Sequence, residues 1–229
     1  MQKATAATDF LDQIGPAERQ ELLTLARHRS FRKSEFVFRA GDRGNGVHFL
    51  LSGRLKFFRL APNGREVILW FCFPGEVFGM AEVRDAKGRR VNVQACEDSR
   101  VAVVPEAAFN EYLDDHPHIS RLCRRVMGAR MGILTNILVN LVADDAYTRI
   151  AKLILHLGAR YGVKQGEDIV LQIPLTHQEI ANMVGTNRQT VTRIIGDLRQ
   201  KGALRINNRR ILIESEEFLQ EMICARARR

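Results

Sequence analysis

The sequence is poor in cysteine, and its cysteines lie far apart. The four are Cys72, Cys96, Cys123 and Cys224. Metal-binding and disulfide-rich proteins carry cysteines at short, repeated spacings, which this chain does not have. No basic or paired context marks Cys96 or Cys123 as a redox switch. We therefore expect reduced thiols, and a protein that works in the cytoplasm.

The sequence also lacks the segments typical of membrane proteins, secreted proteins and common enzymes. Its start, MQKATAATDFLDQIG, has no apolar core of a signal peptide. No run approaches the roughly 18 apolar residues of a membrane span. We find no nucleophile elbow, Walker loop, dinucleotide fingerprint or metal-type cluster in it. The prediction is a soluble protein that is not an enzyme.

What the sequence does have is a basic excess, densest toward its end. The 229 residues carry a formal net charge of +9 and are 45% hydrophobic, so a folded core is expected. Residues 145–229 contain 14 basic and 9 acidic side chains, and residues 174–213 contain 7 and 2. This balance suits a polyanionic partner, although a solvated basic face would have the same composition.

Apolar periodicity in the first half predicts a helix and then a β-domain. The helix is expected over residues 9–28. About seven short strands, separated by turns that often contain glycine, are expected between residues 35 and 105. Asn63-Gly64 is the clearest hairpin turn among them. Strands of this number and spacing are typical of a β-sandwich or β-roll.

A long helix is predicted next, because no proline interrupts the apolar pattern from Ile119 to Val142. About 24 helical residues span roughly 36 Å, which is long for a helix on a small domain. We interpret it as a dimerising coiled coil in which Asn136 or Asn140 fixes the register. The alternative is a helix packed on the chain's own β-domain. The apolar positions are Ile119, Leu122, Val126, Ala129, Ile133, Leu134, Ile137, Leu138 and Leu141.

The region after this helix reads as further helices. Asp144-Asp145 is a candidate N-cap for a helix over about 145–162, and residues 163–174 read as a loop with a short strand. Thr176 and Glu179 then form a capping box, in which hydroxyl and carboxylate each bind a free helix amide. Gly185 permits a tight turn before the next helix.

That next helix begins after Asn187, its predicted cap, and Gly202 ends it. Two short helices joined by a glycine turn are a helix-turn-helix, whose second helix enters the major groove. The segment LRINNRRILIE, with a turn at Asn207-Asn208, reads as a wing suited to phosphate contact. The alternative is an ordinary helical hairpin with solvated arginines. The inward-facing positions are Val191, Ile194, Ile195 and Leu198.

The stretch LTHQEIANMVGTNRQTVTRIIGDLRQKGAL resembles the helix-turn-helix of the cyclic AMP receptor protein / fumarate-nitrate regulator (Crp/Fnr) family of bacterial transcription factors. FRAGDRGNGVHFLLSGRLKFFRLAPNGREVILWFCFPGEVFG resembles that family's effector β-roll, so the likeness covers most of the chain. It implies an α+β fold with an effector β-roll (1–115), a dimerisation helix (116–143) and a winged helix-turn-helix (144–229). It also implies a homodimer on a palindromic operator, with RNA polymerase as partner if the protein is an activator.

The family's DNA-reading pattern is Arg-Glu-Thr-Val-x-Arg, and this chain has Arg-Gln-Thr-Val-Thr-Arg over 188–193. The resemblance therefore carries over both arginines but not the acidic position, which is Gln189. Thr176 and Gln178 match positions that the family uses near the DNA backbone. The expected DNA-binding residues are Thr176, Gln178, Arg188, Gln189, Thr190, Arg193, Arg209 and Arg210.

The effector is harder to predict, and the sequence names no cofactor. Three positions differ from those at which the family binds cyclic AMP. Met80 stands in place of the ribose-binding glutamate, Arg90 in place of a serine, and Leu134 in place of the adenine-contacting threonine. These differences argue against cyclic AMP as the effector. Arg89 and Arg90 are expected to be adjacent on a strand, with only one side chain pointing inward. The alternative is two surface arginines. The candidate effector residues are Gly79, Met80, Arg89, Arg90, Leu134 and Thr135.

The resemblance raises two other kinds of sensor, an iron–sulfur cluster and haem. The first cysteine is Cys72, so the iron–sulfur cluster of the N-terminal-cysteine type is absent. Haem is left open, with His48, His116 and His118 as candidate axial ligands, although we read all three as ordinary surface histidines. Two functions remain: an effector-controlled regulator, and a regulator of the same fold that needs no ligand and is controlled by its abundance.

Overall fold

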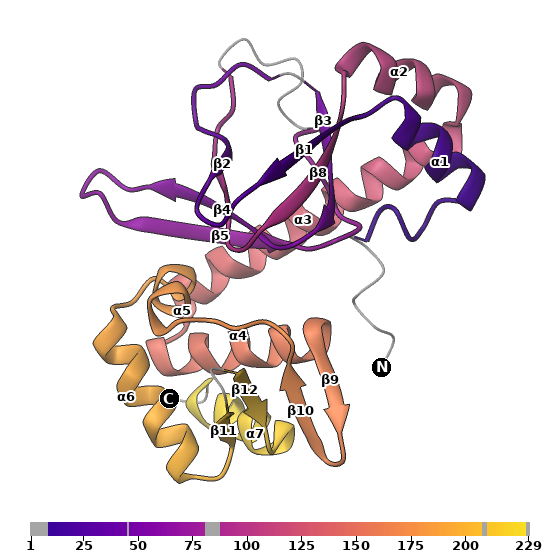
Figure 1. The fold of residues 1–229 in the computed structure, drawn as a ribbon. Helices are drawn as coiled ribbons and strands as arrows, with labels where there is room; N and C mark the ends of the chain where they lie inside the picture. Colours follow the sequence, from indigo (N-terminus) through magenta and orange to yellow (C-terminus); the bar gives the residue numbers. More distant parts are fainter. Residues whose placement is uncertain (1–8, 45, 81–87, 208–209, 228–229) are drawn as a thin grey trace. The chain divides into compact units, whose positions relative to one another are not determined.

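The computed structural model describes residues 9–44, 46–80, 88–207 and 210–227. The chain divides into two compact units, and the division falls inside one long helix, between Ile133 and Leu134. We call the unit up to Ile133 the effector unit and the unit from Leu134 onward the DNA-binding unit. Each is described by itself (Figure 1).

The effector unit contains two four-stranded antiparallel sheets, as the strand pattern predicted. Their strand orders are β1-β8-β3-β6 and β2-β7-β4-β5. The strands are β1 (Arg27–Phe31), β2 (Phe36–Phe38), β3 (Val47–Ser52), β4 (Leu55–Leu60), β5 (Glu66–Cys72), β6 (Val77–Phe78), β7 (Asn92–Ala95) and β8 (Ser99–Val104). The helices are α1 (Pro16–Thr24), α2 (Glu106–Asp115) and the first part of α3 (Pro117–Ala143).

Alternation along the strands gives this unit two apolar cores. On β8, Val101 and Val103 belong to a core shared with the second sheet, where Leu55 and Phe57 lie. Ala102 and Val104 belong instead to a core shared with the helices, which includes residues of α2 and α3. Successive strand residues point to opposite faces, so one central sheet serves both cores.

The predicted helix over residues 9–28 is wrong in its extent. Only Pro16–Thr24 is helical, and Arg27–Phe31 is strand β1, which pairs with β8. Gly15 caps α1, with the Glu18 carboxylate accepting from its amide at 2.8 Å. Phe10 and Leu11, which suggested a helical stripe, are buried ahead of the helix without belonging to it. Tertiary burial, and not periodicity, explains those two apolar residues.

Helix α3 confirms the predicted long helix, and its two ends differ. All its buried residues lie in the first ten positions: Ile119, Leu122, Cys123 and Val126. This part packs on the chain's own β-domain, as the alternative interpretation had it. From Met127 onward large apolar side chains are exposed, with Met131 at 68% and Val142 at 82%. By length and composition alone α3 is also long and apolar enough to cross a membrane, although the sequence predicted no such segment. A single helix of this kind is weak evidence, because core helices of soluble proteins pass the same test.

The DNA-binding unit follows the predicted order of elements, with two additions. The expected loop and strand over 163–174 is a hairpin of β9 and β10, and a helix that was not predicted, α7, follows the wing. The four-stranded antiparallel sheet of this unit has the order β11-β12-β10-β9. Its elements are the second part of α3, α4 (Ala146–Tyr161), β9 (Gly162–Gln165), β10 (Asp168–Leu171), α5 (His177–Val184), α6 (Arg188–Gln200), β11 (Leu204–Asn207), β12 (Arg210–Ile213) and α7 (Glu216–Ala227).

Candidate DNA-binding surface and effector site

The caps predicted for the helix-turn-helix are all present. The Thr176 hydroxyl accepts from the amide of Glu179 at 3.1 Å, and the Glu179 carboxylate accepts from the amide of Thr176 at 2.8 Å. Gly185 has φ 69°, the left-handed conformation that ends α5. The Asn187 side chain accepts from the amide of Thr190 at 2.8 Å and so begins α6. These caps set where the two helices start and stop.

Helix α6 has one buried face and one exposed polar face. Arg188, Gln189 and Arg193 are exposed near its beginning, and Thr190 is half-buried. Thr176 and Gln178, at the start of α5, are exposed as well. The buried face consists of Val191, Ile194, Ile195 and Leu198, as predicted.

Long-range contacts that no local pattern indicates hold α6 in place. The Tyr147 hydroxyl, on α4, donates to the Asp197 carboxylate on α6. The Lys201 ammonium lies 2.9 Å from the same carboxylate, and the Arg226 guanidinium of α7 lies over the Tyr147 ring at 4.1 Å. Tyr147 and Asp197 are 50 residues apart, so no short-range pattern could have linked them.

His177 is a second residue that the sequence reasoning missed. Its Nδ1 lies 2.8 Å from the Thr192 hydroxyl, which donates to the carbonyl of Arg188 at 2.9 Å. Burial, and then the charge of Arg188, lower the pKa of His177. A neutral imidazole thus links the first residue of α5 to the first turns of α6.

The wing is present as a hairpin, with β11 and β12 paired from Leu204↔Ile213 to Asn207↔Arg210. Arg210 is exposed, and its guanidinium lies 3.4 Å from the side-chain oxygen of Gln172. Asn208 and Arg209, on which the predicted turn and one predicted phosphate contact depend, lie outside the described residues.

In the effector unit, Arg89 is buried and Arg90 is exposed. The Arg89 side chain is only 2% exposed. Its guanidinium donates to the carbonyls of Gly79 at 3.0 Å and Gly46 at 2.9 Å, and lies over the Phe38 ring at 4.4 Å. The predicted divergence of the two arginines is therefore present. Their predicted place on a strand is wrong, because β7 begins only at Asn92.

Gly79 lies against Arg89, whereas its neighbour Met80 packs against an apolar core. Gly79 has φ 83°, and a Cβ there would stand 2.8 Å from Nη1 of Arg89 and 3.0 Å from Nδ1 of His48. Glycine is therefore needed both for its conformation and for this close approach. Met80 is half-buried against the apolar core on the helix side. Leu134 and Thr135, the remaining candidate effector residues, are exposed and belong to the other unit.

His48 is not the surface histidine that we expected, because it is only 2% exposed. Its ring stacks on Phe78 at 5.0 Å and meets the edge of Phe38 at 5.5 Å. Burial, and then the charge of Arg89, lower the pKa of His48 to about 3, so the ring is neutral at physiological pH.

His118 is exposed, as expected of a surface histidine, whereas His116 is half-buried. Nε2 of His116 lies 3.5 Å from the Glu21 carboxylate, and Nε2 of His118 lies 2.7 Å from the Glu18 carboxylate. Within the described part of the chain, no group of three or more histidine, cysteine or acidic side chains is arranged to hold a metal ion.

Comparison with known proteins finds a matching domain for each of the two units. A cyclic nucleotide-binding domain model matches residues 28–116, and a Crp-like helix-turn-helix domain model matches residues 148–222. The chain is 28% identical over 219 residues to the CRP-like cAMP-activated global transcriptional regulator of Mycobacterium tuberculosis, covering 96% of this chain and 98% of that protein. It is 29% identical over 192 residues to the transcriptional activator protein Anr of Pseudomonas protegens, covering 84% of this chain and 74% of that protein.

Solved structures give the same result. A CooA mutant from Carboxydothermus hydrogenoformans matches with a TM-score of 0.78 at 27% identity, covering 89% of this chain and 90% of that chain. FixK2 from Bradyrhizobium japonicum matches in fold, with a TM-score of 0.74 at 22% identity, covering 86% of this chain and 96% of that chain. Together with the two domain matches and the helix-turn-helix geometry, these similarities place the chain in the Crp/Fnr family of transcriptional regulators, which bind DNA and act as dimers.

Proposed function

We propose that this regulator reads its operator with the first turns of α6 in the major groove. The observation that carries the proposal is the two-faced character of α6, whose buried face fixes it while Arg188, Gln189 and Arg193 remain exposed. Arginine favours guanine O6 and N7, and glutamine can pair with adenine. Thr190 completes the base-facing set, following the family pattern.

A second set of residues holds the DNA backbone. Thr176 and Gln178, exposed at the start of α5, and Arg209 and Arg210 of the wing are assigned to phosphate contacts. Such contacts fix the register of a protein on the duplex and carry no sequence information directly. The two sets therefore differ in what their loss would do to specificity.

The dimer forms through α3 from Met127 onward. The exposed side chains Met127, Met131, Leu134, Leu138 and Leu141 are spaced 4-3-4-3 along the helix, the seam of a coiled coil. The predicted register residue Asn140 accepts from Lys152 of its own chain at 3.1 Å, so Asn136, which is exposed, is the better candidate. We assign residues 1–115 to effector sensing, 116–143 to dimerisation and 144–229 to DNA binding.

The residues of the β-roll do not fit cyclic AMP. Two donor positions of the Arg89 guanidinium are already bound to the carbonyls of Gly46 and Gly79. Met80 offers an apolar side chain where a ribose hydroxyl would need an acceptor. The effector is therefore a different small molecule or a redox signal, and control by abundance is the competing model.

The protein works in the cytoplasm without enzymatic activity of its own, and contacts RNA polymerase if it activates. Operator binding by the purified protein, with and without candidate ligands, separates effector control from control by abundance. A regulator controlled by abundance would bind equally in every condition.

The proposed reading surface is tested with a matched pair of variants. Arg193→Ala should lose discrimination between the selected operator and scrambled DNA. Arg210→Ala should weaken binding to both DNAs alike and lower the slope of log affinity against log salt by about one unit. Fluorescence anisotropy over a salt series measures both. An Arg193→Ala variant with unchanged discrimination would contradict the proposal.

A further inference from the structure

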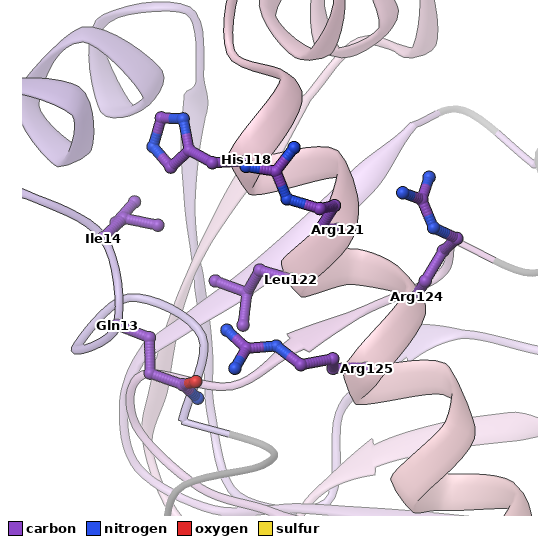
Figure 2. A pocket seen from close by; sticks show the side chains of 7 residues that line it. All are labelled: Gln13, Ile14, His118, Arg121, Leu122, Arg124 and Arg125. Carbon is purple, nitrogen blue, oxygen red and sulfur yellow. The ribbon is translucent and has the colours of Figure 1, made fainter.

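An open hollow of about 720 Å³ lies on the effector unit, beside the first turns of α3 (Figure 2). Figure 2 shows basic side chains on α3 and, across from them, the segment that precedes α1. The basic side chains that line the hollow are His118, Arg121, Arg124 and Arg125. All of them belong to the effector unit, and none is among the candidate effector residues of the β-roll.

The three arginines have no acidic partner in the part of the chain that the structure describes. All are exposed, and the only side-chain contact found for them is from Arg124 to the hydroxyl of Ser120 at 3.2 Å. His118 differs, because it lies 2.7 Å from the Glu18 carboxylate. The free cationic groups of the hollow are therefore the three guanidinium groups.

Their arrangement is unfavourable for the isolated helix. Arg121 is three residues from Arg124 and four from Arg125, the spacings at which like charges on a helix repel each other. A bound polyanion would remove this cost.

The rest of the hollow offers an organic group something to contact. Leu122 and Ile14 form an apolar part of its wall, and the Gln13 side chain adds an amide. Both apolar residues are anchored in the core of the unit, so this wall is rigid. Guanidinium groups match phosphate oxygens in geometry, and two adjacent phosphates concentrate more charge than a carboxylate.

We propose that this hollow binds a molecule carrying at least two adjacent phosphate groups, such as pyrophosphate or a nucleoside di- or triphosphate. Arg121, Arg124 and Arg125 hold the phosphates. Ile14, Leu122 and Gln13 face the organic part when there is one. The site is on the effector unit and would give the regulator a second input besides the β-roll.

Calorimetric titration of the full-length protein with pyrophosphate tests this, at about 0.15 M salt so that long-range attraction is screened. Pyrophosphate should bind saturably and more tightly than sulfate. The double variant Arg121→Gln/Arg125→Gln should lose about a hundredfold in affinity, since each of the two charge-assisted hydrogen bonds contributes about tenfold. Arg100→Gln, which removes an exposed charge of the same unit outside the hollow, should bind as the wild type does.

Two further arms identify the phosphate source. Equal affinity for pyrophosphate and ATP indicates a site for the phosphates alone. Tighter binding of ATP, reduced by Gln13→Ala, indicates a nucleotide. Fluorescence of Trp70, the only tryptophan, confirms that each variant keeps the effector unit folded.

Several results would overturn the proposal. One is a wild type that binds sulfate as tightly as pyrophosphate, and a second is an Arg100→Gln variant that loses as much pyrophosphate affinity as the double variant does. A third is an acidic peptide, such as oligoglutamate, that binds more tightly than pyrophosphate. Another is a double variant that binds operator DNA more weakly while the wild type shows no pyrophosphate binding, which would make the arginines part of the DNA path.

Discussion

The two units of this regulator place their polar side chains in opposite ways. Among the described residues, every buried charged or histidine side chain belongs to the effector unit: His48, Arg54, Glu76 and Arg89. In the described part of the DNA-binding unit the buried polar residues are Thr148 and Asn182, and the arginines on α6 are exposed. The effector unit therefore encloses charged side chains in its interior, whereas the charges of α6 lie at the surface.

This difference predicts where each unit is vulnerable. A buried charge is stable only while its internal partners hold, so acid or a misplaced carboxylate should damage the effector unit first. An exposed charge contributes little to folding, so changes on α6 should leave stability alone and alter DNA recognition. The following variants test this separation, from the largest expected effect to the smallest.

Val126→Glu should have the largest effect. Val126 is 0% exposed in the helix-side core of the effector unit, so the variant buries an unpaired carboxylate. We expect a loss of about 4 kcal/mol or more in the free energy of unfolding. Trp70 fluorescence in a urea titration reports this unit alone, because the chain has no other tryptophan. Ala129→Glu, at a half-buried position of the same helix, is the control. Equal free energies of unfolding for the two variants would refute the placement of Val126 in the core of the effector unit.

Acid should destabilise the effector unit through His48. Its pKa is about 3 in the folded protein and about 6.5 when unfolded, so between these values the unfolded chain binds the extra proton. The contribution of neutral His48 to the free energy of unfolding is therefore fully present above pH 6.5. It is lost as the pH drops toward 3, and its size is on the order of a few kcal/mol. His48→Leu should unfold less steeply with acid, as followed by Trp70 fluorescence. A His48→Leu profile parallel to that of the wild type would show that other groups control it.

Leu138→Glu should abolish the dimer and leave both units folded. Leu138 is 63% exposed on the seam proposed for α3, so the new carboxylate costs nothing in the monomer and faces its own copy in the dimer. Operator affinity should fall about a hundredfold, because simultaneous binding of two half-sites is lost. Sedimentation velocity measures the mass, and a dimer of normal stability would rule out this seam. The same experiment on Val139→Glu, one position further along, locates the edge of the interface.

How much of this could be predicted from the sequence depended on the range of each contact. Thr176 with Glu179 and Asn187 with Thr190 are three residues apart, and both caps were read from spacing alone. Arg89 with Gly46 spans 43 residues, and no periodicity signals such a pair. Tyr147 with Asp197 was missed for the same reason.

The long helix illustrates the same limit. One apolar pattern runs through α3, yet Ile119 and Val126 pack on their own unit while Met131 and Leu138 remain exposed. Periodicity identifies an apolar face but not what covers it, because the covering surface comes from residues far away in the chain. The predicted helix is confirmed, and packing on the chain's own β-domain is right for its first part, while dimerisation through its exposed second part stays a prediction.

The smallest expected effect concerns Gln189, which should change what is read and not how stably the protein folds. Gln189 is the second residue of α6 and is exposed, and its side chain makes no hydrogen bond to the described residues. The related pattern has glutamate there, which accepts from the cytosine amino group. Glutamine has a donor and an acceptor at its tip, matching N6 and N7 of adenine. We therefore expect the half-site of this protein to prefer A·T at the base pair that Gln189 faces.

Gln189→Glu should shift that preference toward G·C by about 1–3 kcal/mol, because the exchanged carboxylate can only accept. Arg188 and Arg193 should keep their preference for guanine, so only one position of the half-site should change. Selection of binding sites from random DNA measures this, with Gln200→Glu as the control, since Gln200 is exposed at the far end of the same helix. If wild type and Gln189→Glu select the same base there, Gln189 meets only phosphate or water. If Gln200→Glu shifts the same base pair, the effect is one of net charge and not of contact.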